Sequence, residues 1–107
     1  MTTWTYPATV VSVVDGDTAH LVIDLGMRCS FTSRVRLAGI NAPELRTATG
    51  PAARDYLASL LPVGAQVTFV SHSLDKYGRP LGAVVLADGR DVSTLMLDAG
   101  QAVRYAG

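Results

Sequence analysis

The chain has 107 residues, 49% of them apolar, and its nine basic and nine acidic residues give a net charge of zero. This length and composition predict a single globular domain, residues 1–107, with one modest core. The apolar runs fall short of the roughly 20 residues that a membrane helix needs. A neutral chain also lacks the broad basic field with which many proteins hold nucleic acid, and the single cysteine, Cys29, excludes an internal disulfide.

The first part of the chain predicts three consecutive β-strands joined by tight turns. Residues 8–14 are mostly β-branched, and residues 19–25 alternate between apolar and polar side chains. Asp15-Gly16 between these runs predicts a hairpin, and a third strand is predicted at residues 29–37. The side chains predicted to face the core are Ala19, Leu21, Ile23, Leu25, Phe31, Val35 and Leu37.

Residues 41–49 are predicted to form a loop, and the first of two helices follows it. A Gly-Pro pair begins a helix that runs from about residue 51 to residue 61, because proline is tolerated in the first turn. Asp91 is predicted to cap a short second helix that Gly100 ends. The apolar faces are Ala53, Leu57, Leu60 and Leu61 on the first helix and Val92, Leu95, Met96 and Ala99 on the second.

Two further strands are predicted at residues 65–71 and 81–87, on either side of a polar loop at residues 73–80. Five short strands with one main helix between the third and fourth, and a short second helix, predict a mainly β (α+β) fold. The best match is a five-stranded barrel of the OB type. The alternative is an open α+β sheet, which would leave unpaired strand edges to be covered.

Three separate segments carry the residue types that suit chemistry on a phosphodiester. RLAGINAPE at residues 36–44 begins with Arg36 on the polar face of the third strand and ends with a carboxylate after a proline turn. VVDGDT lies at residues 13–18 and DKYGR at residues 75–79. If the fold brings the three together, carboxylate and amide oxygens will lie beside two guanidinium groups.

Each of these residues also has an ordinary structural explanation. Asp-Gly turns such as Asp15-Gly16-Asp17 commonly only turn the chain, Glu44 could be a surface residue, Arg36 a cross-strand ion pair and Arg79 a solvated loop residue. The pair of arginines favours function, because two fixed guanidinium groups complement the charge of a phosphoryl-transfer transition state.

The ligands that these segments offer to a metal are all oxygen atoms. They predict Ca²⁺, with Mg²⁺ or Mn²⁺ second. Tyr77 beside Lys76 could stack on a base or contact a terminal phosphate, although a tyrosine in an exposed turn often has no such role.

Taken in order, VVDGDT, VRLAGINAPE, LDKYGRPLG and DVSTLMLDAGQA resemble the thermonuclease family, the staphylococcal-nuclease-like domains. The resemblance runs from about residue 7 to residue 104, and several ordered motifs are far more specific than any one of them. It implies a five-stranded OB-type barrel and Ca²⁺-dependent, sugar-non-specific hydrolysis of phosphodiester bonds in DNA and RNA.

The resemblance also implies roles for individual residues. Asp17 and Asn41 would hold the metal through their side chains, and Ala42 through its main-chain carbonyl. Glu44 would act as the general base or position the attacking water. The remaining implied contacts are with the substrate: Arg36 and Arg79 with the reacting phosphate, and Lys76 and Tyr77 with a terminal phosphate.

The chain departs from the family pattern in four ways. Asn41 replaces an aspartate, which predicts weaker metal binding, and Ala42 replaces a threonine that would contribute only its carbonyl. The chain stops soon after Tyr105, so the family's C-terminal helix is missing, which predicts a marginal domain or a homodimer. The loop at residues 45–49 carries one basic residue, Arg46, and a neutral chain gains less affinity from counterion release.

The sequence therefore predicts a metal-dependent nuclease acting on DNA or RNA, preferably single-stranded. The alternative is a weakened nuclease-like module that binds nucleic acid or a protein partner without cleaving it. A purely structural barrel would leave the paired arginines unexplained. The N-terminal residues do not resemble an export signal, which predicts a cytoplasmic or phage-encoded intracellular setting without membrane association.

Overall fold

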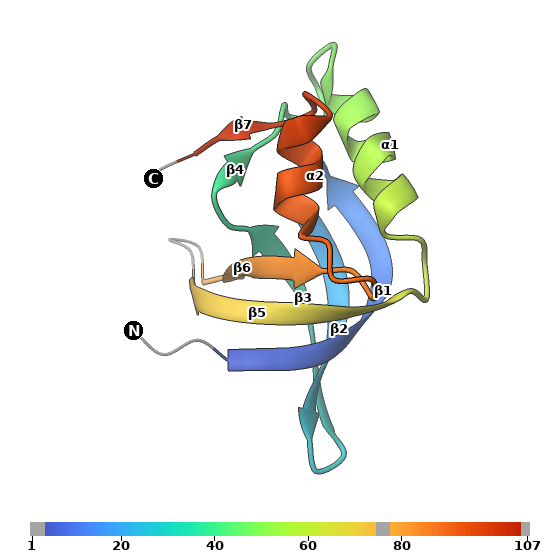
Figure 1. Cartoon of the computed structure of the whole chain (residues 1–107), viewed down its shortest axis with the longest axis vertical. Helices are drawn as coiled ribbons and strands as arrows, with labels where there is room; N and C mark the ends of the chain where they lie inside the picture. The colour runs from blue at the N-terminus through green and yellow to red at the C-terminus, as the bar shows by residue number, and fades with distance from the viewer. Residues whose placement is uncertain (1–3, 75–77, 106–107) are drawn as a thin grey trace.

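The computed structural model describes residues 4–74 and 78–105. Five of its strands close into a barrel in the order β1-β2-β3-β6-β5, which confirms the barrel prediction (Figure 1). The barrel strands are β1 (Trp4–Asp15), β2 (Thr18–Gly26), β3 (Cys29–Leu37), β5 (Gln66–Leu74) and β6 (Pro80–Val85). Two helices accompany them, α1 (Gly50–Leu60) and α2 (Val92–Asp98).

The barrel closes through one parallel junction. All the other neighbours, β1 with β2 and β5, β2 with β3, and β5 with β6, are antiparallel. β3 and β6 run parallel and pair at Arg36 with Leu81 and at Leu37 with Gly82. A side chain at Gly82 would collide with the Val70 carbonyl, so glycine is needed for the close approach of β5 and β6 at this point.

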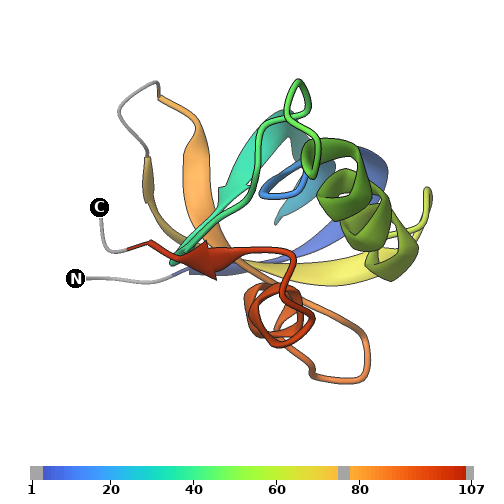
Figure 2. The ribbon, with the colours of Figure 1, turned by 90° about the horizontal axis from the view of Figure 1, so that it is seen from above.

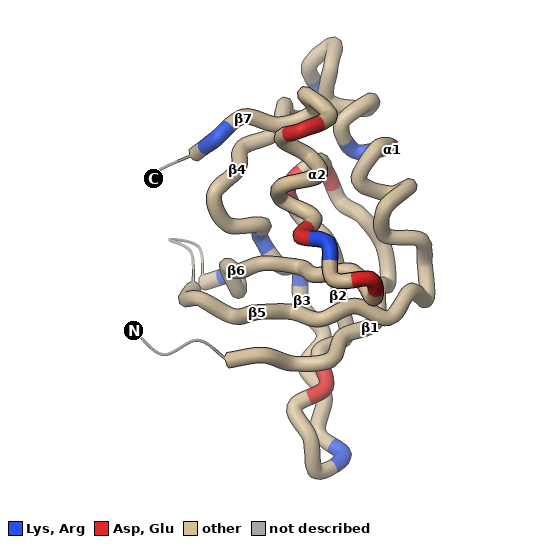
Figure 3. The backbone as a smooth tube through the Cα atoms, viewed as in Figure 1, with Lys and Arg blue, Asp and Glu red and all other residues tan. Residues whose placement is uncertain are grey.

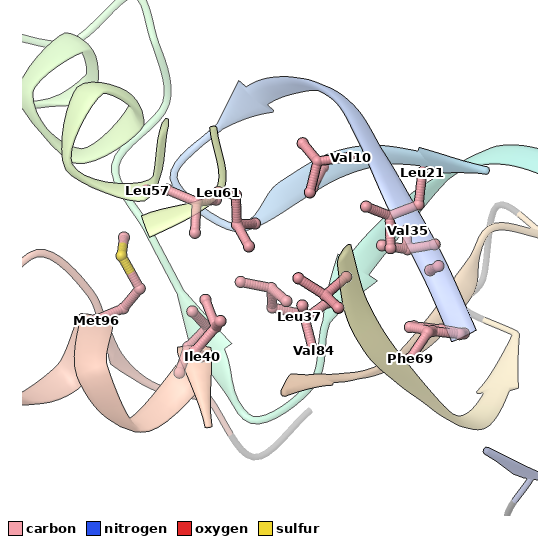
Figure 4. Packing of buried hydrophobic residues seen from close by; sticks show 14 of the residues in the cluster. Val10, Leu21, Val35, Leu37, Ile40, Leu57, Leu61, Phe69, Val84 and Met96 are labelled. Atoms are coloured by element: carbon pink, nitrogen blue, oxygen red, sulfur yellow. The ribbon is translucent and has the colours of Figure 1, made fainter. Parts of the chain in front are cut away.

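The core fills the barrel and continues beneath the helices. Each barrel strand contributes alternate apolar side chains, and α1 contributes Ala53 and Leu57, as its 3.6-residue spacing predicts. Leu61 directly after α1 and Met96 on α2 complete the packing at the helical end. The side chains labelled in Figure 4 are Val10, Leu21, Val35, Leu37, Ile40, Leu57, Leu61, Phe69, Val84 and Met96.

The hairpin between β2 and β3 corrects two of the core predictions. Leu25 and Phe31 were predicted to face inward, but they are 48% and 47% exposed. The alternation of these strands continues past the barrel, and the hairpin projects beyond it (Figure 1). Its outer part therefore has no core to face.

Two smaller details also differ from the sequence-based expectation. β1 begins at Trp4 and pairs with β5 from its first residue. Asp91 occupies the position before α2, but its carboxylate accepts a hydrogen bond from the Thr94 hydroxyl (3.1 Å) and none from a backbone N–H. Neither helix of the described residues is long and apolar enough to cross a bilayer.

Two very short strands form a second, separate sheet. β4 (Ile40–Asn41) pairs antiparallel with β7 (Val103–Arg104), so the chain after α2 returns to the segment that follows β3 (Figures 1 and 2). The Tyr105 N–H extends this pairing by donating to the Gly39 carbonyl at 3.0 Å. The sheet therefore fixes the last described residues against the segment that carries Asn41.

Candidate active site

A pocket of about 640 Å³ opens where the β1–β2 turn, the end of β3, β4 and the start of β6 meet. Its lining includes every described residue that the sequence singled out for a role at the phosphate or metal: Asp17, Arg36, Asn41, Ala42, Glu44 and Arg79. Elsewhere, acidic and basic residues are interspersed along the tube, and neither sign forms a continuous field in this view (Figure 3). Lys76 and Tyr77 lie outside the described residues.

Arg36 is held in place by a set of contacts on the floor of this pocket. Its Nη1 donates to the carbonyls of Leu37 and Ile40, both at 3.0 Å, and its Nη2 donates to Asn41 Oδ1 at 3.3 Å. Nη1 also lies 3.4 Å from Asp17 Oδ2, and the Arg36 side chain is only 13% exposed. The guanidinium group is therefore preorganised by the β3–β4 turn.

Asp17 connects the first and second motifs directly. Its Oδ2 accepts a hydrogen bond from the Ala42 N–H at 3.0 Å, and its Oδ1 accepts one from the Thr18 hydroxyl at 3.1 Å. The Asp17 carbonyl accepts from the Leu37 N–H at 2.8 Å. Because Asp17 is 8% exposed, these contacts hold a carboxylate that is largely removed from bulk water.

Gly16 allows this turn to pack closely against its neighbours. A Cβ at Gly16 would lie 2.6 Å from the Ala42 Cβ and 2.9 Å from the Ala53 Cβ, well inside van der Waals contact. The turn between β1 and β2 therefore rests on both α1 and the segment that follows β4. Small residues at three separated positions make this contact.

Asp15 is a site residue that the predicted ligand set left out. It lines the pocket, and its Oδ1 accepts from the Asp17 N–H at 3.2 Å. Burial raises the pKa of the Asp15 carboxyl, and hydrogen bonding and charge repulsion from Asp17 raise it further. The signal was present in the sequence, since two aspartates flanking one glycine must lie close together.

Glu44 and Arg79 reach the pocket from its edges. The Glu44 side chain is 67% exposed and forms an ion pair with Arg46, with 2.7 Å between Arg46 Nε and Glu44 Oε2. The Glu44 carbonyl accepts from both the N–H and the hydroxyl of Thr47, so the turn is rigid although its carboxylate is exposed. Arg79 precedes β6 and is half-buried. The structure thus brings both arginines to one pocket.

The donor atoms around Asp15, Asp17 and Asn41 fit a hard divalent cation. All of these donors are oxygen atoms, which such cations prefer. The Asp15 and Asp17 carboxylates repel each other when both are charged, and a bound cation would reduce that repulsion. In residues 4–74 and 78–105, three or more His, Cys, Asp or Glu side chains do not gather into a metal-holding group. Such a cation would therefore draw part of its coordination from an amide, backbone, water or phosphate oxygen.

Comparisons with known proteins show which proteins the chain resembles. A family model described as staphylococcal nuclease homologue matches residues 34–106. Over 96 residues the chain is 38% identical to an "Uncharacterized endonuclease" of Escherichia coli O157:H7, covering 90% of the chain and 59% of that protein.

Two further relatives have related names. One is "Micrococcal nuclease" of Shigella flexneri, 41% identical over 75 residues, with 70% of the chain and 40% of the relative covered. The other is "Endonuclease YhcR" of Bacillus subtilis, 33% identical over 114 residues, with 94% of the chain and 9% of the relative covered. The chain thus spans 59% or less of each of these proteins.

Proposed function

Because the chain belongs to the staphylococcal nuclease homologue family, we propose that it is a metal-dependent nuclease that hydrolyses phosphodiester bonds of DNA or RNA. One observation carries the proposal: Asp17, Arg36 and Arg79, from three distant parts of the chain, line a single pocket. A scaffold that only bound a partner would not require this combination of an acidic pair and two guanidinium groups.

The residues divide into those that hold a metal and those that act on the phosphate. Asp17 and Asn41, with Asp15 beside them and the Ala42 carbonyl, would hold Ca²⁺, with Mg²⁺ or Mn²⁺ as alternatives. The cation would supply positive charge opposite a non-bridging phosphate oxygen. Asn41 ligates through a neutral amide oxygen, which is consistent with weaker binding than a carboxylate would give.

Arg36 and Arg79 bind and orient the phosphate and neutralise the charge that builds on its equatorial oxygens. The oxygen of a water molecule attacks phosphorus while the bond to the leaving oxygen breaks. Glu44 accepts the proton from the water, and the leaving oxygen takes a proton from solvent. Arg36 needs little reorganisation for this role, because its hydrogen bonds already fix the guanidinium group.

The Glu44–Arg46 ion pair is compatible with a general base at Glu44. Both side chains are more than half exposed, and exposed ion pairs contribute only about 0–1 kcal/mol. Glu44 can therefore exchange Arg46 for a water molecule at little cost. We also propose that the substrate is preferably single-stranded.

The test is cleavage of single-stranded DNA and RNA by the purified protein in Ca²⁺, Mg²⁺, Mn²⁺ or chelator. We expect metal-dependent cleavage that Asp17→Asn abolishes and that Asp24→Asn, a matched change at an exposed aspartate of β2, leaves intact. Tight binding without cleavage in every metal would refute the nuclease and favour the non-catalytic binding module.

A further inference from the structure

We propose that Tyr105 is a positioning residue for Arg36, which holds the guanidinium group in the orientation needed for phosphate contact. The inference rests on the nuclease function proposed above. The starting observation is a ring contact with Tyr105, a residue that lies outside the sequence motifs. Arg36 Cζ lies over the Tyr105 ring, 5.8 Å from its centroid. Both residues line the same pocket.

The main chain around Tyr105 is fixed independently of its side chain. β7 pairs with β4, and the Tyr105 N–H donates to the Gly39 carbonyl at 3.0 Å. The segment that carries Tyr105 is therefore attached to the same turn whose Ile40 carbonyl accepts from Arg36. The ring and the guanidinium group are anchored to one small sheet, so their separation does not depend on a long or mobile connection.

The ring contact complements the hydrogen bonds of Arg36. Those bonds engage the terminal nitrogens, Nη1 and Nη2, with acceptors in the β3–β4 turn. The Tyr105 contact acts at the centre of the guanidinium group and takes up none of its N–H donors. It can therefore restrict movement of the whole group while leaving donors available to a phosphate oxygen.

A contact that fixes the group without touching the substrate predicts a particular kinetic signature. For Tyr105→Leu, which keeps an apolar side chain but removes the π face, we expect kcat to fall about fivefold, the rate effect of a cation–π contact of modest strength. KM should change little. Tyr105→Phe retains the ring and should restore kcat, and Phe31→Leu removes an equally exposed ring far from the pocket and serves as the matched control.

A second measurement does not require activity. In the metal-free protein, the Arg36 Nε–Hε resonance, identified by its loss in Arg36→Lys, should carry a ring-current shift that disappears in Tyr105→Leu and persists in Tyr105→Phe. An unchanged resonance in Tyr105→Leu would overturn the proposal, as would an unchanged kcat or an effect confined to KM. If the wild type cleaves nothing, the nuclease proposal fails, and the resonance alone still decides whether Tyr105 positions Arg36.

Discussion

Arg36→Ala should cost both stability and catalysis, and the contacts of Arg36 allow the two losses to be separated. Truncation removes the hydrogen bonds to the Leu37 and Ile40 carbonyls, each at 3.0 Å, and the partner of the buried Asp17 carboxylate. At about 1 kcal/mol for each hydrogen bond and about 3 kcal/mol for leaving the buried Asp17 carboxylate without its partner, we expect the unfolding free energy to fall by about 5 kcal/mol. Small domains have about 5–15 kcal/mol in total, so the catalytic comparison is made at a temperature where the variant is still folded.

The catalytic loss should be larger than the loss of stability explains. Removing one preorganised donor from a phosphate or oxyanion site reduces the rate about a hundredfold. Cleavage of a fluorogenic single-stranded oligonucleotide should therefore fall by at least that factor under conditions where circular dichroism shows the variant fully folded. Urea unfolding followed by the same signal gives the stability.

Arg34→Ala is the matched control, because Arg34 lies two residues earlier on β3 and is exposed. It should unfold within about 0.5 kcal/mol of the wild type, as surface substitutions usually do, and cleave normally. If Arg36→Ala is as stable as the wild type, the contacts around the guanidinium group do not hold the turn. If it cleaves at the wild-type rate, Arg36 has no part in the reaction.

Three further predictions concern the acidic turn and its neighbours. The pKa of Asp15 in the folded protein lies above its ordinary value of 3.8, so the folded state binds more protons than the unfolded state. The stability of the wild type therefore declines as pH rises through the raised pKa. Asp15→Asn should be more stable than the wild type at neutral pH, and urea unfolding near pH 3 should show no such gain. Asn41→Asp adds a carboxylate to the ligand set and should tighten Ca²⁺ binding about tenfold by isothermal titration calorimetry, whereas an unchanged affinity would exclude Asn41 as a ligand. Gly16→Ala forces a methyl group against Ala42 and Ala53 and should lower unfolding free energy by roughly 1–3 kcal/mol; a variant as stable as the wild type would show that the turn does not pack as described.

The barrel could be predicted from the alternation of side chains within single strands, and much of the pocket could be predicted from several motifs taken together. The alternation of residues 19–25 and the bounds of the strand at residues 29–37 follow from side chains that must face one core. Arg36 and Arg79 each have an ordinary explanation alone, and their convergence on one pocket is a property of the closed barrel. In the sequence, this convergence was implied only by the resemblance of the ordered motifs to the nuclease family.

The features that could not be predicted from the sequence depend on contacts between short segments that are far apart in the chain. β4 and β7 contain two residues each, too few for any periodicity, so neither their pairing nor the arrival of Tyr105 beside Arg36 could be read from the sequence. The exposure of Leu25 has a different origin. Alternation identifies which side chains share a face, but it does not reveal where the barrel beneath that face ends.

On heating, the barrel should open first at the parallel junction between β3 and β6. It is held by two paired positions, whereas every other junction of the described barrel has six or more. Arg36 is one of those two positions, so the junction with the fewest paired residues also carries an arginine proposed to act on the phosphate. Transient local opening of the β3–β6 junction would separate the phosphate-binding groups while the other strand pairs stay intact. On warming, activity should therefore disappear before the circular dichroism signal of the strands does.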